Sequence, residues 1–241
     1  MEYITIFGDI HANLPAYEAV IEDMDQRESG NRYCLGDLVG YGVSPNEVIQ
    51  AIRESGVPTI MGNYDQGIGH SSDECGCAYR DELSKQLGKL SIAWTNQHTS
   101  QENKLFLRGL LHDFPLQLGE LKVLLVHGSP RKINEYLYED RPESSLERIM
   151  DQAGVDVLVC GHTHIPYHRI LSSGRHVINA GSVGKPKDHD PRACYVILEV
   201  EGREVKARFI RVPYDVEQAA AGIETSDMPD EYAGMLRAGA G

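Results

Sequence analysis

The chain has 241 residues, of which 41% are hydrophobic and 24% charged, as in an ordinary globular protein of about one domain. It carries 23 basic and 36 acidic residues, a formal net charge of −13, which argues against nucleic acid as a partner but leaves room for a small phosphorylated substrate. No apolar run approaches the roughly 20 residues that span a membrane, and residues 1–8 do not read as a signal peptide, so a cytoplasmic protein is expected.

The first sixty or so residues alternate short apolar runs with amphipathic segments, the pattern of an α/β fold. Strands are predicted at residues 3–7, 32–35 and 57–61, and helices at residues 14–24 and 45–56. Ser44 and Glu47 have the spacing of a capping box at the start of the second helix, and Pro45 suits its first position. Alternation of strands and helices at this spacing predicts a largely parallel sheet.

Residues 66–118 break the alternation, and two or three helices are predicted there as a helical insertion or cap. One of them begins at Thr99-Ser100. Further strands are predicted at residues 121–126, 155–160, 167–171, 176–179, 193–200 and 204–212, with a helix from about Ser144. We therefore expect one domain over residues 1–215 that contains the insertion, followed by a C-terminal helix and tail over residues 216–241.

Five of the apolar runs end in a glycine or histidine next to further polar side chains. These polar residues are Asp9, His11, Asp37, Asn63, His127, His162 and His164. Because the carboxyl ends of strands in an open α/β sheet meet at one edge, the seven side chains are expected to converge. Oxygen and imidazole donors without a thiolate suit Zn, Mn, Fe, Ni or Co. Asp37 stands alone after its strand and is the natural carboxylate to bridge two such ions.

This order of motifs resembles the calcineurin-like metallophosphoesterases, in the small bacterial and archaeal phosphodiesterase branch. The matching segments are residues 8–11, 36–42, 62–65, 127–128 and 161–164, and residues 179–184 and 190–193 resemble the downstream signature of that branch. The resemblance covers about residues 3–212. It implies an α/β fold with an αββα four-layer β-sandwich flanked by helices. It also implies a metal-dependent hydrolase that cleaves phosphoester bonds, above all phosphodiesters of a small molecule or nucleotide.

Applied residue by residue, the resemblance implies two metal ions. Asp9, His11 and His164 would bind the first, Asn63, His127 and His162 would bind the second, and Asp37 would bridge both. The hydroxide held by the two metals would be the nucleophile, and Asp37, Asn63, Tyr64 and His162 are the implied catalytic residues. Tyr64 stands where the family more often has a histidine that contacts the phosphate. A phenol with a pKa near 10 is a poor proton shuttle at neutral pH but can donate a hydrogen bond. Diesters with acidic leaving groups are therefore expected to react better than alkyl monoesters.

Substrate binding is expected from Asn13, Tyr64 and Arg192. Asn13 could reach a substrate oxygen, or it could equally cap the helix that starts at Leu14. Arg192 is one of several cations in loops near the ligand-bearing runs, of which one or two could clamp a phosphate. The others are Arg131, Lys132, Lys185, Lys187 and His189. Asp65 could orient a ligand histidine or serve as a turn or cap carboxylate.

Five cysteines in a chain without a secretory signal do not predict a disulfide framework. Cys75 and Cys77 form a C-x-C in the insertion, either as thiols of no catalytic use or as a redox-sensitive pair or a lid contact to substrate. A disulfide between them would close a small strained ring and is not expected. Two other functions stay open: an interaction scaffold of the same fold, which seven competent ligands disfavour, and a nuclease, which the acidic charge disfavours.

Overall fold

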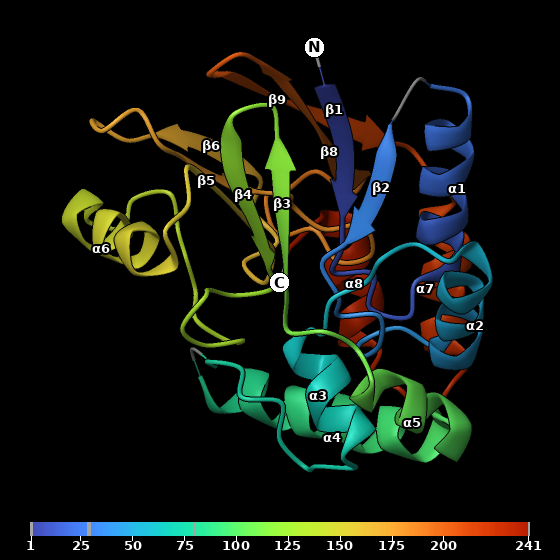
Figure 1. The fold of residues 1–241 in the computed structure, drawn as a ribbon. Coiled ribbons are helices and arrows are strands. Elements are labelled where there is room, and N and C mark those ends of the chain that lie inside the picture. Colours follow the sequence, from blue (N-terminus) through green and yellow to red (C-terminus); the bar gives the residue numbers. More distant parts are fainter. Residues whose placement is uncertain (1, 28–29, 80, 241) are drawn as a thin grey trace.

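The computed structural model describes residues 2–27, 30–79 and 81–240, which form two β-sheets stacked between layers of helices (Figure 1). The first sheet has the order β2-β1-β8-β9, and the second the order β3-β4-β5-β7-β6. The strands of the first sheet are β1 (Glu2–Phe7), β2 (Asn31–Cys34), β8 (Ala193–Glu201) and β9 (Glu204–Val212). Those of the second are β3 (Asp113–Leu118), β4 (Leu121–Val126), β5 (Val157–Cys160), β6 (Tyr167–Ile170) and β7 (His176–Asn179).

Both sheets are mixed, so the prediction of a largely parallel sheet is wrong. Strand β1 runs parallel to β2 but antiparallel to β8, and β5 runs parallel to both β4 and β7, while the edge pairs β3–β4, β6–β7 and β8–β9 are antiparallel. The strand predicted at residues 57–61 is also absent as a full strand. It makes only isolated bridges, from Thr59 to Cys34 and from Ile60 to Leu111, because Pro58 has no N–H to extend a ladder.

The space between the sheets is filled by alternate residues of their strands. Along β8, Val196 and Leu198 join the core between the sheets, whereas Tyr195 and Ile197 point to the helices on the outer face. This alternation follows from the two-residue period of a strand. Each fully buried aliphatic side chain of this kind contributes roughly 1.5–3 kcal/mol of hydrophobic stabilisation. Strand β8 is therefore buried on both faces at the centre of the molecule.

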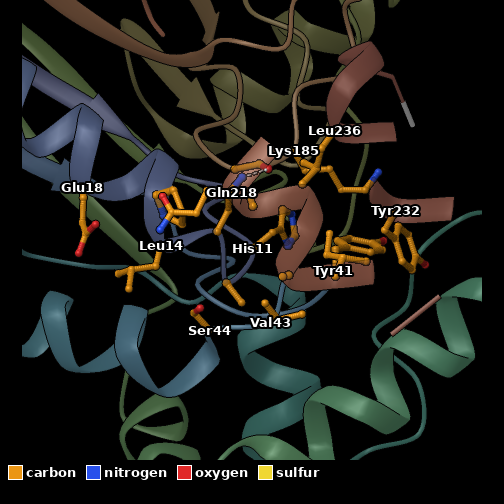
Figure 2. A pocket seen from close by; sticks show the side chains of 18 residues that line it. His11, Leu14, Glu18, Tyr41, Val43, Ser44, Lys185, Gln218, Tyr232 and Leu236 are labelled. Carbon is orange, nitrogen blue, oxygen red and sulfur yellow. Dashed lines mark hydrogen bonds between the residues drawn. The ribbon is translucent and has the colours of Figure 1, made fainter. Parts of the chain in front are cut away.

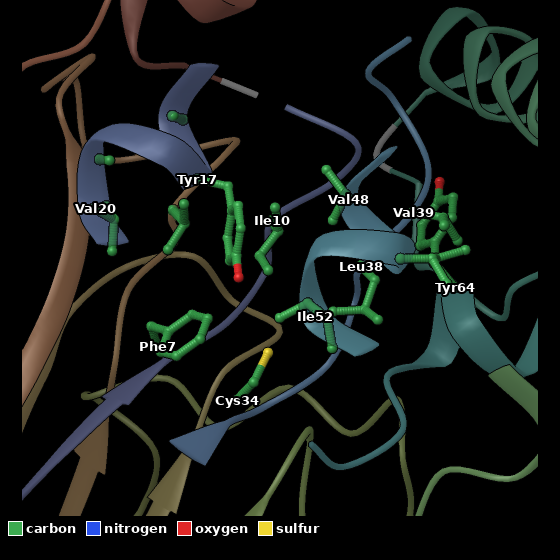
Figure 3. Packing of buried hydrophobic residues seen from close by; sticks show 14 of the residues in the cluster. Phe7, Ile10, Tyr17, Val20, Cys34, Leu38, Val39, Val48, Ile52 and Tyr64 are labelled. Atoms are coloured by element: carbon green, nitrogen blue, oxygen red, sulfur yellow. The ribbon is translucent and has the colours of Figure 1, made fainter. Parts of the chain in front are cut away.

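Helices cover the outer face of each sheet, which confirms the predicted αββα sandwich. Helices α1 (Leu14–Asp25) and α2 (Pro45–Ser55) pack on the first sheet through a cluster that includes Phe7, Tyr17 and Ile52 (Figure 3). Helix α6 (Glu143–Ala153) packs on the second sheet through Leu146 and Ile149. The capping box predicted before α2 is not formed, since no side chain caps this helix, and Gly56 ends it in the left-handed conformation with φ 64°.

Three helices lie beyond one end of the sheets, as predicted for the insertion: α3 (Asn63–Gly69), α4 (Glu82–His98) and α5 (Gln101–Arg108). Ser100 caps α5 by accepting a hydrogen bond from the backbone nitrogen of Asn103. Strand β3 occupies the last part of the range 66–118. The range 216–241, expected as a helix and a tail, holds two helices, α7 (Val216–Glu224) and α8 (Glu231–Ala238), which share a buried cluster with Leu87 of α4.

In the described part of the chain, no helix combines the length and the apolar character needed to cross a membrane.

Candidate metal centre

The structure brings all seven predicted ligands together at one end of the sandwich. Asp9 and His11 follow β1, Asp37 follows β2, His127 follows β4, His162 and His164 follow β5, and Asn63 opens α3. All seven are buried, with at most 3% of any of them exposed. Strand ends that are far apart in the sequence thus meet where the predicted convergence requires.

Asp9, His11 and His164 form the first group. The Nε2 atoms of the two histidines lie 3.2 Å apart, and Oδ1 of Asp9 lies 3.3 Å from Nε2 of His164 and 3.8 Å from Nε2 of His11. The other carboxylate oxygen, Oδ2, accepts a hydrogen bond from the backbone nitrogen of His162 at 3.1 Å. Oδ1 is buried and has no hydrogen-bond partner among the described residues. Three donor atoms therefore face one point, and one of them lacks any protein partner.

Asp37, His127 and His162 form the second group, and Asn63 adds a fourth donor. Nε2 of His127 lies 3.4 Å from Oδ2 of Asp37 and 3.0 Å from Oδ1 of Asn63. Nε2 of His162 is buried and, within the described ranges, makes no hydrogen bond. Oδ2 of Asp37 is also only 3.6 Å from Nε2 of His11. This oxygen stands between the two groups, as a bridging ligand would.

Backbone carbonyls fix the orientation of three of the imidazoles. Nδ1 of His11 donates to the carbonyl oxygen of Val39 at 3.0 Å, and Nδ1 of His127 donates to that of Leu35 at 2.9 Å. Nδ1 of His164 makes the same bond to Lys185 at 2.5 Å. With the proton on Nδ1, the Nε2 lone pair is turned toward the site, which is the usual arrangement of a metal-binding histidine.

The amide of Asn63 is oriented in a similar way. Its Nδ2 donates to the carbonyl oxygen of Cys75 at 2.8 Å and contacts the sulfur of Cys77 at 3.4 Å. Only the oxygen is then left to face His127.

Five of the seven predicted ligands adopt the left-handed backbone conformation that non-glycine residues seldom take. Their φ values lie between 50° and 66°, and the residues are Asp9, His11, Asp37, His162 and His164. Each such residue costs about 1 kcal/mol, and such strain gathers at functional sites where the surrounding fold enforces it.

Glycines leave the room that the carboxylates need. A Cβ on Gly62 would lie 2.1 Å from Oδ1 of Asp37, and one on Gly161 would lie 2.6 Å from Oδ2 of Asp9. The glycines that precede Asn63 and His162 are therefore required by close approach rather than by a turn.

The charges of the site suit divalent cations. Burial lowers the pKa of His11 to about 3 and the pKa values of His162 and His164 well below the usual range, so these imidazoles are neutral donors. Burial also opposes protonation of His127, but the charge of Asp37 prevails and raises its pKa to about 10. Burial and the same charge raise the pKa of Asp65 to about 7. Three neutral imidazoles beside carboxylates, with Oδ1 of Asp9 and Nε2 of His162 lacking partners among the described residues, fit divalent metal ions.

A cavity of about 370 Å³ opens onto the ligands, and its lining includes His11, Asp37, Asn63, His162 and His164. We call it the metal cavity. Six tyrosines also line it: Tyr41, Tyr64, Tyr79, Tyr136, Tyr138 and Tyr232. The Tyr64 hydroxyl is buried without a hydrogen-bond partner in the described structure, and burial raises its pKa well above 10. Tyr64 is thus a protonated donor at neutral pH.

The other two predicted substrate-binding residues do not line the metal cavity. Asn13 caps α1 by accepting a hydrogen bond from the backbone nitrogen of Ala16 at 3.2 Å, and its Nδ2 donates to the carbonyl oxygen of Gly184 at 2.9 Å. It lines a second cavity of about 300 Å³ behind His11, bounded by α1, α7 and α8 (Figure 2). Arg192 is exposed and forms an ion pair with Asp190 at 2.6 Å.

Asp65, Cys75 and Cys77 also have defined places. The Asp65 carboxylate accepts hydrogen bonds from the backbone nitrogens of Leu38 and Gly62, so it acts as a turn and cap carboxylate and ties two ligand-bearing loops together. Cys75 is buried, Cys77 lines the metal cavity, and both are free thiols.

Several residues of the cavity wall carry no motif that would single them out. Tyr136, whose ring lies 4.1 Å from that of His162, comes from the loop after β4, and Tyr232 comes from α8. The sequence does not distinguish Lys185 from the other loop cations. Its position directly after residues 179–184, which resemble the downstream signature of the family branch, nevertheless indicates a place near the site.

Comparison with known proteins reveals extensive similarity. The calcineurin-like phosphoesterase superfamily domain matches residues 3–203. An uncharacterized protein of Methanocaldococcus jannaschii is 31% identical over 243 residues, which cover 94% of each chain. The crystal structure of a metallophosphoesterase from Sphaerobacter thermophilus is 30% identical, with 98% of both chains covered and a TM-score of 0.75. A hypothetical protein of Pyrococcus horikoshii is 26% identical, with 98% of both chains covered and a TM-score of 0.83.

Proposed function

The chain belongs to the calcineurin-like phosphoesterase superfamily and is a phosphoric ester hydrolase, and from this premise we propose that it cleaves phosphodiesters at a dinuclear metal centre. The proposed substrate is a small molecule or nucleotide in the cytoplasm. A cavity of about 370 Å³ is of a size for such a ligand.

The position of Asp37 carries this proposal. Its Oδ2 lies within 3.6 Å of Nε2 of both His11 and His127, one from each ligand group. One group, Asp9, His11 and His164, would hold the first ion, and Asn63, His127 and His162 the second, with Asp37 shared. Bound divalent ions would polarise the phosphoryl group and make a water ionise near neutral pH. The donor set accepts Zn, Mn, Fe, Ni or Co.

Tyr64 supports a diester as the substrate. Tyr64 lines the metal cavity, and its hydroxyl, which keeps its proton, would donate a hydrogen bond to a phosphoryl oxygen. It cannot supply a proton to a poor leaving group near pH 7. The residue therefore favours esters whose leaving group departs as a stable anion, such as a phenolate or a phosphate.

The test combines metal analysis with activity. The purified protein is stripped with a chelator, reloaded with Mn²⁺ or Zn²⁺, analysed for metal by mass spectrometry and assayed with a chromogenic aryl diester. We expect two ions per chain and turnover that depends on them. Asp37→Ala should lose at least one ion and about 10³-fold or more in turnover, since a shared ligand serves both sites. Arg192→Ala is the matched control outside the metal cavity and should keep both ions. One ion per chain in the active wild type would contradict the dinuclear proposal.

A further inference from the structure

Lys185 is a buried cation in the wall of the metal cavity. Only 5% of the residue is exposed. Its side chain extends over two rings, with Nζ 4.8 Å from the ring centre of Tyr41 and 5.8 Å from that of Tyr232 (Figure 2). Tyr41 comes from the loop after β2 and Tyr232 from α8. Elements from both ends of the sequence thus enclose one ammonium group.

The described residues offer Lys185 no counter-charge. Among residues 2–27, 30–79 and 81–240, no carboxylate forms an ion pair with it, whereas Arg192 and Arg211 pair with Asp190 and Asp188. Two cation–π contacts offset only part of the free energy needed to remove an ammonium group from water. A buried cation that the protein leaves without a counter-charge is suited to an anion from outside.

The position of Lys185 indicates which anion. It lines the metal cavity together with His11, Asp37 and Lys187. Its backbone carbonyl accepts the Nδ1 hydrogen bond of His164 at 2.5 Å, which fixes the residue next to the first ligand group. In a chain of net charge −13, two lysines in one cavity form a local positive region beside the metal ligands.

We propose that Lys185 binds the phosphoryl group of the substrate, with its ammonium, held between Tyr41 and Tyr232, donating a hydrogen bond to a phosphoryl oxygen. This inference rests on the proposed function of the same cavity. It gives the chain a phosphate-binding residue that Arg192 does not provide, and it makes α8 part of the substrate site through Tyr232.

Lys185→Met tests the proposal, because methionine keeps an unbranched apolar side chain and removes the charge. Lys132→Met is the matched control, an equal change of charge at an exposed lysine outside the metal cavity. For both variants and the wild type, inorganic phosphate is titrated calorimetrically into the Mn²⁺-loaded protein, and metal content, Tm, KM and kcat are measured.

We expect Lys185→Met to keep its metal and Tm and to raise both the Kd for phosphate and KM by roughly 10-fold to 100-fold, the effect of losing one charge-assisted hydrogen bond. The fall in kcat should be smaller, and Lys132→Met should match the wild type. An unchanged phosphate Kd would overturn the proposal, and so would loss of metal, because the residue would then act only through His164.

A second variant and the phosphate titration of the wild type allow this inference to be tested separately from the proposed function. Tyr232→Leu removes one of the two rings without touching the His164 contact, and we expect it to weaken phosphate binding by about 3-fold to 10-fold. If Lys185→Met does not fold, this variant decides the question, and an unchanged Kd overturns the proposal. If the wild type shows no turnover, the proposed function fails, while the phosphate titration still tests Lys185.

Discussion

The backbone nitrogen of Tyr64 donates a hydrogen bond to Oδ1 of Asp37 at 2.8 Å. One oxygen of this carboxylate is thus held by the protein, and the other, Oδ2, faces His11 and His127. Because the bond comes from the main chain, a change of the side chain at position 64 leaves the position of Asp37 intact. The predicted ligand set and the side chain proposed to contact the substrate can therefore be varied separately.

Tyr64→His should change substrate preference without loss of metal. An imidazole in this place can give up a proton near neutral pH, which a phenol with a raised pKa cannot. We expect the rate on an alkyl phosphomonoester to rise by about 10-fold or more relative to the rate on an aryl diester. Steady-state rates for the two substrates, with metal content as a check, measure this ratio. Tyr64→Phe, which has no proton to donate, should lower both rates, and an unchanged ratio in Tyr64→His would count against a leaving-group role.

Gly62→Ala should damage the metal centre. The new Cβ would collide with Oδ1 of Asp37, so the carboxylate or the loop that carries it must shift. We expect a loss of about 1–3 kcal/mol in the free energy of unfolding and loss of at least one bound ion. Gly234→Ala in α8 is the control, since its Cβ would meet no atom within 4 Å. That substitution should stabilise the helix by about 0.5–1 kcal/mol and leave metal content unchanged. Full metal occupancy in Gly62→Ala would show that Asp37 tolerates the shift.

Metal removal should destabilise the folded chain. Asp9 and Asp37 are both buried, each lies within 4 Å of Nε2 of His11, and Oδ1 of Asp9 has no partner within the described structure. Bound cations would therefore offset an unfavourable arrangement. A free metal concentration of 100 times Kd stabilises by about 2.7 kcal/mol per site, which corresponds to roughly 5–10 °C in Tm for a chain of this size. Scanning fluorimetry with and without chelator measures the difference. Asp37→Ala should show a much smaller response to metal, and an equal response would place the stabilising ions elsewhere.

Protonation of the pair His168–His176 should weaken the fold in acid. Nε2 of His168 lies 2.9 Å from Nδ1 of His176, and burial, together with the charge of His168, lowers the pKa of His176 from 6.5 to about 4. The unfolded chain then binds more protons than the folded one between these values, so this contribution to stability is complete above pH 6.5 and is lost as the pH falls toward 4.

His176→Gln tests this effect and should keep a hydrogen bond to His168. Relative to the variant, the wild type should lose about 1.5 kcal/mol between pH 6.5 and pH 4, after a reduction for the partial exposure of the pair. Denaturant unfolding is measured at a series of pH values for both proteins after a chelator has removed bound metal. Without metal, the pH dependence of the metal centre does not contribute to the difference. Parallel stability profiles for the two proteins would exclude the pair as its source.

The convergence of the ligands could be predicted from the sequence because it depends on strand ends. Asp9, Asp37 and His127 each follow an apolar run, and the carboxyl ends of these strands meet wherever the strands share a sandwich. The family was also predictable, since its motifs follow one another in the family's order along most of the chain, and the match over residues 3–203 confirms it.

The pairing partners of the strands and several residues that line the metal cavity could not be predicted in this way. The direction of β8 beside β1 depends on a pairing between residues such as Ile4 and Leu198, which no local pattern encodes. Ser44 has the spacing of a cap, yet its side chain makes no capping hydrogen bond. Tyr232 lies in a polar, alanine-rich segment whose helix is stabilised by tertiary contacts with α7 and α4 rather than by its own periodicity.

The pairing of β1 with β8 also sets the order in which the molecule can be completed. The strand at the N-terminus finds its antiparallel neighbour only in residues 193–201. At a ribosomal rate of about 5–20 residues per second, one edge of β1 waits roughly 10–40 s for that neighbour to be synthesised. During this interval an apolar strand is exposed to other nascent chains, so yield in a cell should depend on chaperones that shield it and fall when translation is slowed.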